Sequence, residues 1–166
     1  MGLEEIIEVA EEVGNRDERR RDAFLREFEA YEADELDVFE ETRAALGAER
    51  DALAELRTEL DREEGSIEEL IDRTEFLTVD QAVRNRDATL GKLRAHNDHL
   101  GAFVEAMDEA LERVERNLDA LEREGPEAVS ADPDPAFERA HEALEAHNTA
   151  VEGLDSNMMI LNAYLI

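Results

Sequence analysis

The clearest pattern along the chain is a heptad repeat of apolar residues between positions 76 and 121. One series recurs every seven residues, and a companion series lies three residues later. The first series is Phe76, Val83, Leu90, Asn97, Val104, Leu111 and Leu118, and the second is Val79, Arg86, Leu93, Leu100, Met107, Val114 and Leu121. Positions a and d of a coiled coil have this spacing. The pattern predicts one long helix whose apolar seam packs against other helices.

Prolines and glycines divide the rest of the chain. All three prolines lie within 125–135, and proline cannot sit comfortably inside a helix, so this segment is expected to be a loop. Gly14 predicts an early helix end, and Gly65 followed by Ser66 predicts a stop and a new N-cap. The expected elements are a short helix over 3–13, helix A over 17–63, a connector with a short helix over 64–78, helix B over 79–124, a proline-rich loop over 125–134 and helix C over 135–165.

These elements predict an all-α fold: a single helical domain over 1–166, built as an elongated antiparallel helical bundle or coiled coil of three long helices plus a short N-terminal helix. In helix A the apolar residues recur in steps of eleven as far as Phe39 and in steps of seven beyond it. Helix C is shorter than A and B, so the bundle would have only two helices near residues 45–95. That gap predicts a partner, either a homo-oligomer with a dimer favoured, or a helical protein partner.

Composition adds an unusual charge balance. The chain has 46 acidic and 18 basic residues, a formal net charge of −28, and Lys92 is its only lysine. This balance resembles that of cytoplasmic proteins from organisms that hold molar salt inside the cell, because concentrated salt screens a highly anionic surface. The acidic start and the absence of a long apolar run argue against a signal peptide and a membrane span, so a cytoplasmic location is expected.

The segment 158–166 is apolar at every position except Asn162. A single helix seam cannot bury so many apolar residues. We therefore expect helices A and B, or another chain, to cover this segment on several sides.

Asn97 stands where the seam of helix B calls for an apolar residue. A buried amide at such a position can fix the register between helices, and Arg43, Thr42 or Asn162 could be its partner. His96 and His99 are then flanking surface positions. The alternative is a metal site at His96 and His99, but two imidazoles alone do not complete a coordination shell.

A second candidate metal site lies in helix C. Glu138 and His141 have the Glu-x-x-His spacing of di-iron bundles, and His141 with Glu145 has a related spacing. A di-iron site needs that unit twice, and this chain has it once. His147 lies on the helix seam and is interpreted as a hydrogen-bonded core histidine.

No other motif identifies a reaction. The chain has no cysteine and no glycine-rich phosphate loop, so no catalytic residue and no cofactor are predicted. The arginines within 16–22 are interleaved with acids at the start of a predicted helix and suggest a solvated face. The net charge argues against nucleic acid as a partner.

The predicted function is a non-enzymatic coiled-coil scaffold or adaptor that acts by self-association or protein–protein interaction in a high-salt cytoplasm. One alternative is a metal- or small-molecule-binding bundle that uses Glu138, His141 and His147. The other is a hairpin-type chaperone, whose exposed apolar tip would contain Phe76, Leu77 and Val79.

The acidic surface predicts that stability depends on salt. Lowering the salt from about 1 M to below about 0.1 M lengthens the Debye length from about 3 Å to 10 Å or more, so the acidic side chains repel one another. The melting temperature followed by circular dichroism should fall over this range. An unchanged melting temperature would show that the acidity has no role in tolerating salt.

Overall fold

The computed structural model describes residues 3–165, which form five α-helices, one short 3-10 helix and no strand. This confirms the prediction of an all-α fold. The helices are α1 (Leu3–Glu32), α2 (Glu40–Thr74), α3 (Asp80–Glu124), η1 (Pro126–Ala128), α4 (Asp134–Ala150) and α5 (Leu154–Leu165).

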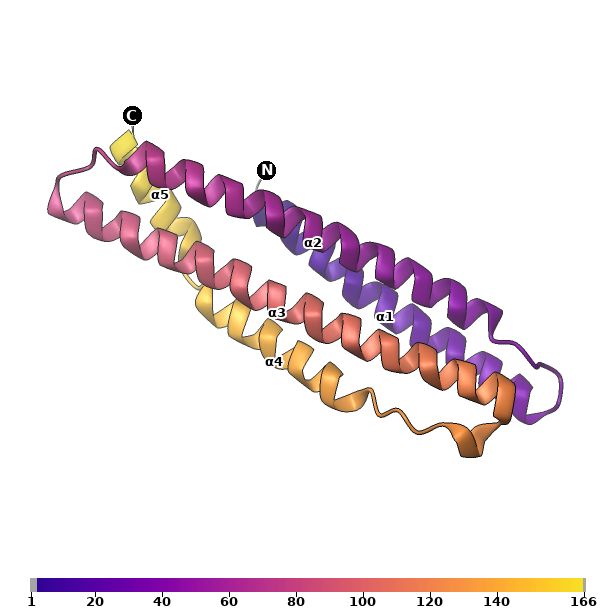
Figure 1. The fold of residues 1–166 in the computed structure, drawn as a ribbon. Helices are drawn as coiled ribbons and strands as arrows, with labels where there is room; N and C mark the ends of the chain where they lie inside the picture. Colours follow the sequence, from indigo (N-terminus) through magenta and orange to yellow (C-terminus); the bar gives the residue numbers. More distant parts are fainter. Residues whose placement is uncertain (1–2, 166) are drawn as a thin grey trace.

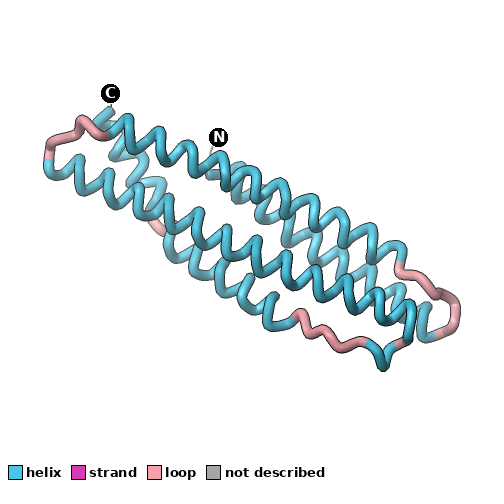
Figure 2. Tube along the Cα trace, viewed as in Figure 1, coloured by secondary structure: helices cyan, strands magenta, loops and turns pink. Residues whose placement is uncertain are grey.

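The four helices α1 to α4 run up and down in turn along one long axis (Figures 1 and 2). Helix α1 packs on α2, α2 on α3, and α3 on both α4 and α5. Helices α1 to α4 share one large core cluster, whose fully buried members include Ile6, Leu53, Leu56, Leu100 and Leu111. A smaller cluster of Ile67, Leu90, Leu93 and Leu154 joins α5 to α2 and α3.

The expected helix A is wrong, because the structure has two antiparallel helices in its place. Helix α1 continues through Gly14, and the chain turns at 33–39 with Asp34 in the left-handed region at φ 59°. Helix α2 then continues through Gly65, and the Ser66 hydroxyl donates to the Arg62 carbonyl oxygen within the helix instead of capping a new one. A lone glycine costs a helix about 1 kcal/mol relative to alanine, which tertiary packing overrides.

The turn at 33–39 was missed because its helix cap comes from distant parts of the chain. The N-cap position of α2 is Phe39, whose side chain cannot accept a hydrogen bond. The Glu27 carboxylate of α1 instead accepts bonds from the backbone N–H groups of Glu41 and Thr42, both at 2.8 Å, and from the Thr42 hydroxyl at 2.6 Å. Glu122 of α3 accepts the Phe39 N–H at 2.9 Å. Two carboxylates on neighbouring helices therefore satisfy the first turn of α2.

The expected helix C is also wrong, because it breaks at 151–153 into α4 and α5. Gly153 has φ 73°, a conformation that favours glycine. The Lys92 ammonium donates to the Glu152 carbonyl oxygen at this break and lies 3.4 Å from the Asn157 side-chain oxygen. A Cβ added at Gly153 would lie 3.3 Å from Lys92 Nζ. The absence of a side chain at Gly153 therefore leaves room for the Lys92 ammonium at the bend.

The break changes the predicted shape of the bundle. Helix α1 reaches only part of the way along α2, and α5 lies over the end of the bundle beyond α1 (Figure 1). Four helices thus share the core at one end, while α2, α3 and α5 form the other end. The two-helix section expected near 45–95 is absent from the described chain, because α1 covers the first part of α2 and α5 covers the last. No helix in residues 3–165 is long and apolar enough to span a bilayer.

The capping of α2 gives a stability prediction. Glu27 is 8% exposed, so Glu27→Ala leaves three donors in a buried region without their acceptor. The free energy of unfolding should fall by about 1–3 kcal/mol, measured by denaturant titration in concentrated salt. Glu29→Ala, at an exposed position of the same helix, is the matched control. Equal losses in the two variants would contradict the capping role.

Candidate functional site

The most unusual polar contact in the core joins His96 of α3 to His147 of α4. Their ring nitrogens, His96 Nδ1 and His147 Nε2, are 2.8 Å apart, and the two side chains are 1% and 5% exposed. His147 Nδ1 lies 3.2 Å from the amide oxygen of Asn148. Because that oxygen only accepts, His147 Nδ1 bears the proton and His96 Nδ1 donates to His147 Nε2. His96 Nε2 is then an unprotonated nitrogen, and it is buried without a partner.

Burial keeps this pair neutral near pH 7. Desolvation, followed by repulsion from His147, lowers the pKa of His96 to about 4. Burial also lowers the pKa of His147. The hydrogen bond that His147 donates to Asn148 opposes this shift, and the nearby charge of His99 adds to it. In this neutral pair the two rings hydrogen-bond each other, and only His96 Nε2 has a free lone pair. One free lone pair does not make a chelate, so the pair acts as a hydrogen bond within the core.

Of the histidines suggested as metal ligands, the structure joins His96 to His147 and leaves His141 on the surface. The expectation that His96 is a surface position is wrong, because α4 packs on the face of α3 that contains it. His99 is partly exposed on that helix. His141 pairs with Glu145 at 3.3 Å on an open surface, where their side chains are 73% and 70% exposed, and Glu138 is exposed beside them. Within residues 3–165, no three histidine or acidic side chains converge on a point that could hold a metal ion.

Asn97 lies between α2 and α3, but none of its expected partners is the one observed. Its side-chain nitrogen donates to the Leu60 carbonyl oxygen at 3.2 Å, and its oxygen is buried without a partner. Arg43 pairs instead with Glu122 at 2.6 Å and with Asp119 at 2.7 Å. The expected partners were wrong because α2 continues to Thr74, so that the residues near 60 face Asn97.

The arginine segment is also less exposed than predicted. Arg20 is 5% exposed, and its Nε donates to the Glu49 carboxylate of α2 at 2.7 Å. It also pairs with Asp17 one turn away. Burial raises the pKa of Glu49, and the Arg20 charge opposes this shift. The apolar periodicity of α1 could not reveal this contact, because its partner lies 29 residues away on another helix.

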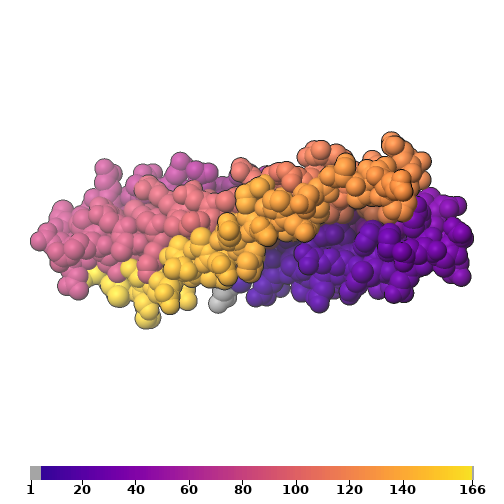
Figure 3. Space-filling view, turned by 90° about the horizontal axis from the view of Figure 1, so that it is seen from below, coloured from indigo at the N-terminus to yellow at the C-terminus, as the bar shows by residue number. Residues whose placement is uncertain are grey.

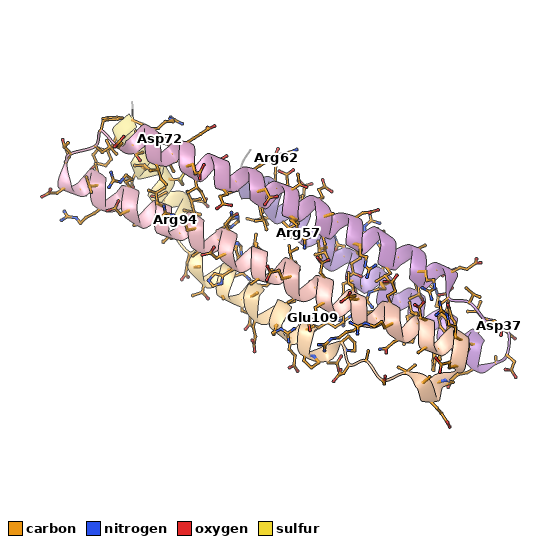
Figure 4. All side chains as sticks on the ribbon, viewed as in Figure 1. Asp37, Arg57, Arg62, Asp72, Arg94 and Glu109 are labelled. Atoms are coloured by element: carbon orange, nitrogen blue, oxygen red, sulfur yellow. The ribbon has the colours of Figure 1, made fainter. Side chains whose placement is uncertain are left out.

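The outer surfaces of the bundle are strongly charged. Figure 4 shows charged side chains such as Arg57, Arg62, Asp72 and Glu109 projecting along its length. Several charged side chains form exposed ion pairs, including Arg26 with Glu41 at 3.2 Å. Such pairs contribute little stability individually and are screened by salt. These ion pairs belong to a solvated surface and do not form a binding site.

An apolar cleft of about 450 Å³ opens between α1, α3, the proline-rich loop and the start of α4. Phe24 and Phe28 of α1 stack at 5.5 Å on one side, and Phe137 of α4 lies on the other. The guanidinium groups of Arg20 and Arg21 lie 5.4 and 5.3 Å from the centre of the Phe137 ring. The cleft could not be predicted from the sequence, because its walls come from five separated segments, including Thr42 of α2.

Helix α5 has a second apolar face that nothing in residues 3–165 covers. Leu154 and Leu161 are buried toward the bundle, whereas Met159, Ile160 and Tyr164 are 71%, 45% and 36% exposed. Figure 3 shows α5, in yellow, at the surface of the molecule. The expectation that the chain's own helices cover the segment is therefore wrong for its outer face, and position 166 lies outside the described residues.

The chain matches no known family model, no curated protein and no solved structure.

The histidine pair predicts acid sensitivity. The lowered pKa values mean that the folded protein binds fewer protons at these imidazoles than the unfolded chain does. Their stabilising contribution is present above about pH 6.5, the pKa of an unperturbed histidine, and is lost as the pH falls toward about 4. Because of this pair, the free energy of unfolding of the wild type should fall by on the order of 3 kcal/mol between pH 7 and pH 4.

The variant His96→Asn tests this prediction, because its amide can still donate to His147 but does not titrate. Unfolding free energies measured from pH 7 to pH 4 should depend less on pH in this variant. His141→Asn is the control at an exposed position. The pKa values of Glu49 and Glu63 are raised by burial and act in the opposite direction, so the difference between variants isolates the histidines. Parallel pH profiles for wild type and His96→Asn would refute the role of the pair.

Proposed function

We propose that this protein is a non-enzymatic helical bundle that works by association, as a scaffold or adaptor in a high-salt cytoplasm. The observation that supports this most directly is the uncovered apolar face of α5. A helix that is apolar on opposite sides is ordinarily buried on both. Here Leu161 is fully buried, while Met159 on the other side is 71% exposed. A second protein surface would complete the burial.

The outer face of α5 has the spacing of a helix-packing seam. The spacing is that of a heptad. Ser156 and Ala163 are seven residues apart, and Met159 and Ile160 lie three and four residues after Ser156. The small side chains at both ends of this seam let another helix approach closely. Such a surface suits contact with another helix. Because α5 is short, this contact would be weak and would depend on the protein concentration.

Charge favours a second copy of the same chain as the partner. Two molecules of net charge −28 repel each other across most of their surfaces. In α5, Asp155 is the only charged residue. Contact between two α5 helices therefore brings the fewest like charges together, and it becomes stronger when salt screens the remainder. A two-fold axis near Met159 and Ile160 would pair the helices antiparallel.

The natural absence of cysteine allows a direct test. In an antiparallel pair centred between residues 159 and 160, Ser156 of one copy faces Ala163 of the other. A mixture of Ser156→Cys and Ala163→Cys should therefore form disulfide-linked dimers on oxidation in about 1 M salt, more than either variant alone. Glu142→Cys, exposed on α4, is the control. The products are measured by non-reducing electrophoresis.

Solution mass provides the independent measurement. Wild type should show a concentration-dependent rise toward the dimer mass in sedimentation, and Met159→Glu should remain monomeric with an unchanged melting temperature. Self-association would be ruled out by a wild type that stays monomeric, together with a mixture of Ser156→Cys and Ala163→Cys that cross-links no faster than Glu142→Cys. Association with a different protein would then be tested by purification from the source cells in concentrated salt, with Met159→Glu as the comparison.

One observation favours the hairpin-type chaperone as a second candidate. Phe76 and Val79, in the connection between α2 and α3, are 66% and 61% exposed. An apolar tip could hold unfolded chains. Suppression of aggregation of a denatured test protein by wild type, and its loss in Phe76→Ser, would support this candidate over the scaffold.

A further inference from the structure

We propose that the apolar cleft between α1 and the proline-rich loop binds a neutral, ring-containing apolar small molecule. This proposal does not depend on association through α5, because the cleft lies among α1, α3, η1 and α4. Its volume of about 450 Å³ is within the range of ligand pockets, which are mostly apolar and often lie between the helices of bundles.

Two polar side chains on the cleft walls, Asn117 and Thr42, already have partners in the chain. The Asn117 amide donates to the Ala131 carbonyl oxygen at 2.6 Å and accepts the Ala131 N–H at 3.1 Å. The Thr42 hydroxyl donates to Glu27 at 2.6 Å. A polar ligand would therefore lose its hydration without gaining comparable hydrogen bonds.

Electrostatics also favours a neutral ligand. Arg20 is matched by Glu49 and Asp17, and Arg21 pairs with Asp17 at 2.9 Å. These pairs leave no free positive charge for an anion. The two guanidinium groups would repel a cation at the same wall. They do, however, lie over the ring of Phe137, and such an arrangement also suits the π face of a bound aromatic ring.

The shape of the walls favours a flat molecule. Phe24 and Phe28 form a stack with rings inclined by 26°, and Phe137 faces the cleft from α4. Aromatic rings add stacking contacts to the burial of apolar surface. Val114 and Leu118 of α3 form the apolar floor between them.

A pair of fluorescent probes tests the ligand class. N-phenyl-1-naphthylamine is neutral, and 1-anilinonaphthalene-8-sulfonate has the same ring system with an added negative charge. The neutral probe should bind one per chain with increased fluorescence, and the anionic probe should bind at least about tenfold more weakly. Equal or tighter binding of the anionic probe would overturn the proposed class.

Three variants locate the binding site. Val114→Trp places a large ring in the cleft and should weaken binding of N-phenyl-1-naphthylamine by at least about tenfold. Leu25→Trp, on the exposed side of α1 where Leu25 is 61% exposed, should not change it. Met159→Glu should also leave it unchanged, which separates the cleft from the apolar face of α5.

The proposal is overturned if the probe does not bind, or if binding is lost in Met159→Glu and retained in Val114→Trp. If circular dichroism shows that Val114→Trp does not fold, Val129→Trp fills the cleft from the proline-rich loop, and the same tenfold loss is expected. Retained binding in a folded Val129→Trp would then overturn the location.

Discussion

The bundle depends on how the first turn of α2 is capped. The backbone N–H groups in the first turn of a helix need acceptors, and the Phe39 side chain at the N-cap position of α2 cannot provide one. Glu27 and Glu122 approach from two other helices and provide them. Glu122 also pairs with Arg43, which lowers the pKa of its carboxyl. Contacts at one helix end thus join α1, α2 and α3, and the hydrogen bonds that cap α2 are complete only when all three helices are in place.

The same dependence explains what could be predicted from sequence. The all-α fold and the extent of α3 followed from the heptad series, which is a local signal that tertiary packing reinforces. The turn at 33–39 contains no proline or glycine, and its capping residues lie far away in the chain. Only the change from steps of eleven to steps of seven near Phe39 marked its place. Conversely, Gly14 and Gly65 resembled helix ends, but packing along α1 and α2 extends both helices through them.

The candidate sites show a related limit. His147 was interpreted as a core histidine, and it is buried; its partner His96 was assigned to the surface, because a helical repeat does not say how many neighbours a helix has. Helix α4 covers a second face of α3, and that contact buries His96. The residues that line the cleft come from five segments, whose proximity depends on the bundle as a whole. Periodicity identifies the apolar faces of helices, but which of these faces contact one another is known only from the three-dimensional structure.

The joint between α4 and α5 has a chemical consequence. Lys92 is the only lysine in the chain, and its ammonium rests against Gly153 and the end of α4. A guanidinium is broader and planar, so this compact position suits an ammonium better than the arginine used for the chain's other side-chain cations. Amine-directed reagents would therefore find a single side chain to modify, located at the bend. The protein offers, without mutation, one point at which a spectroscopic label can report on the movement of α5.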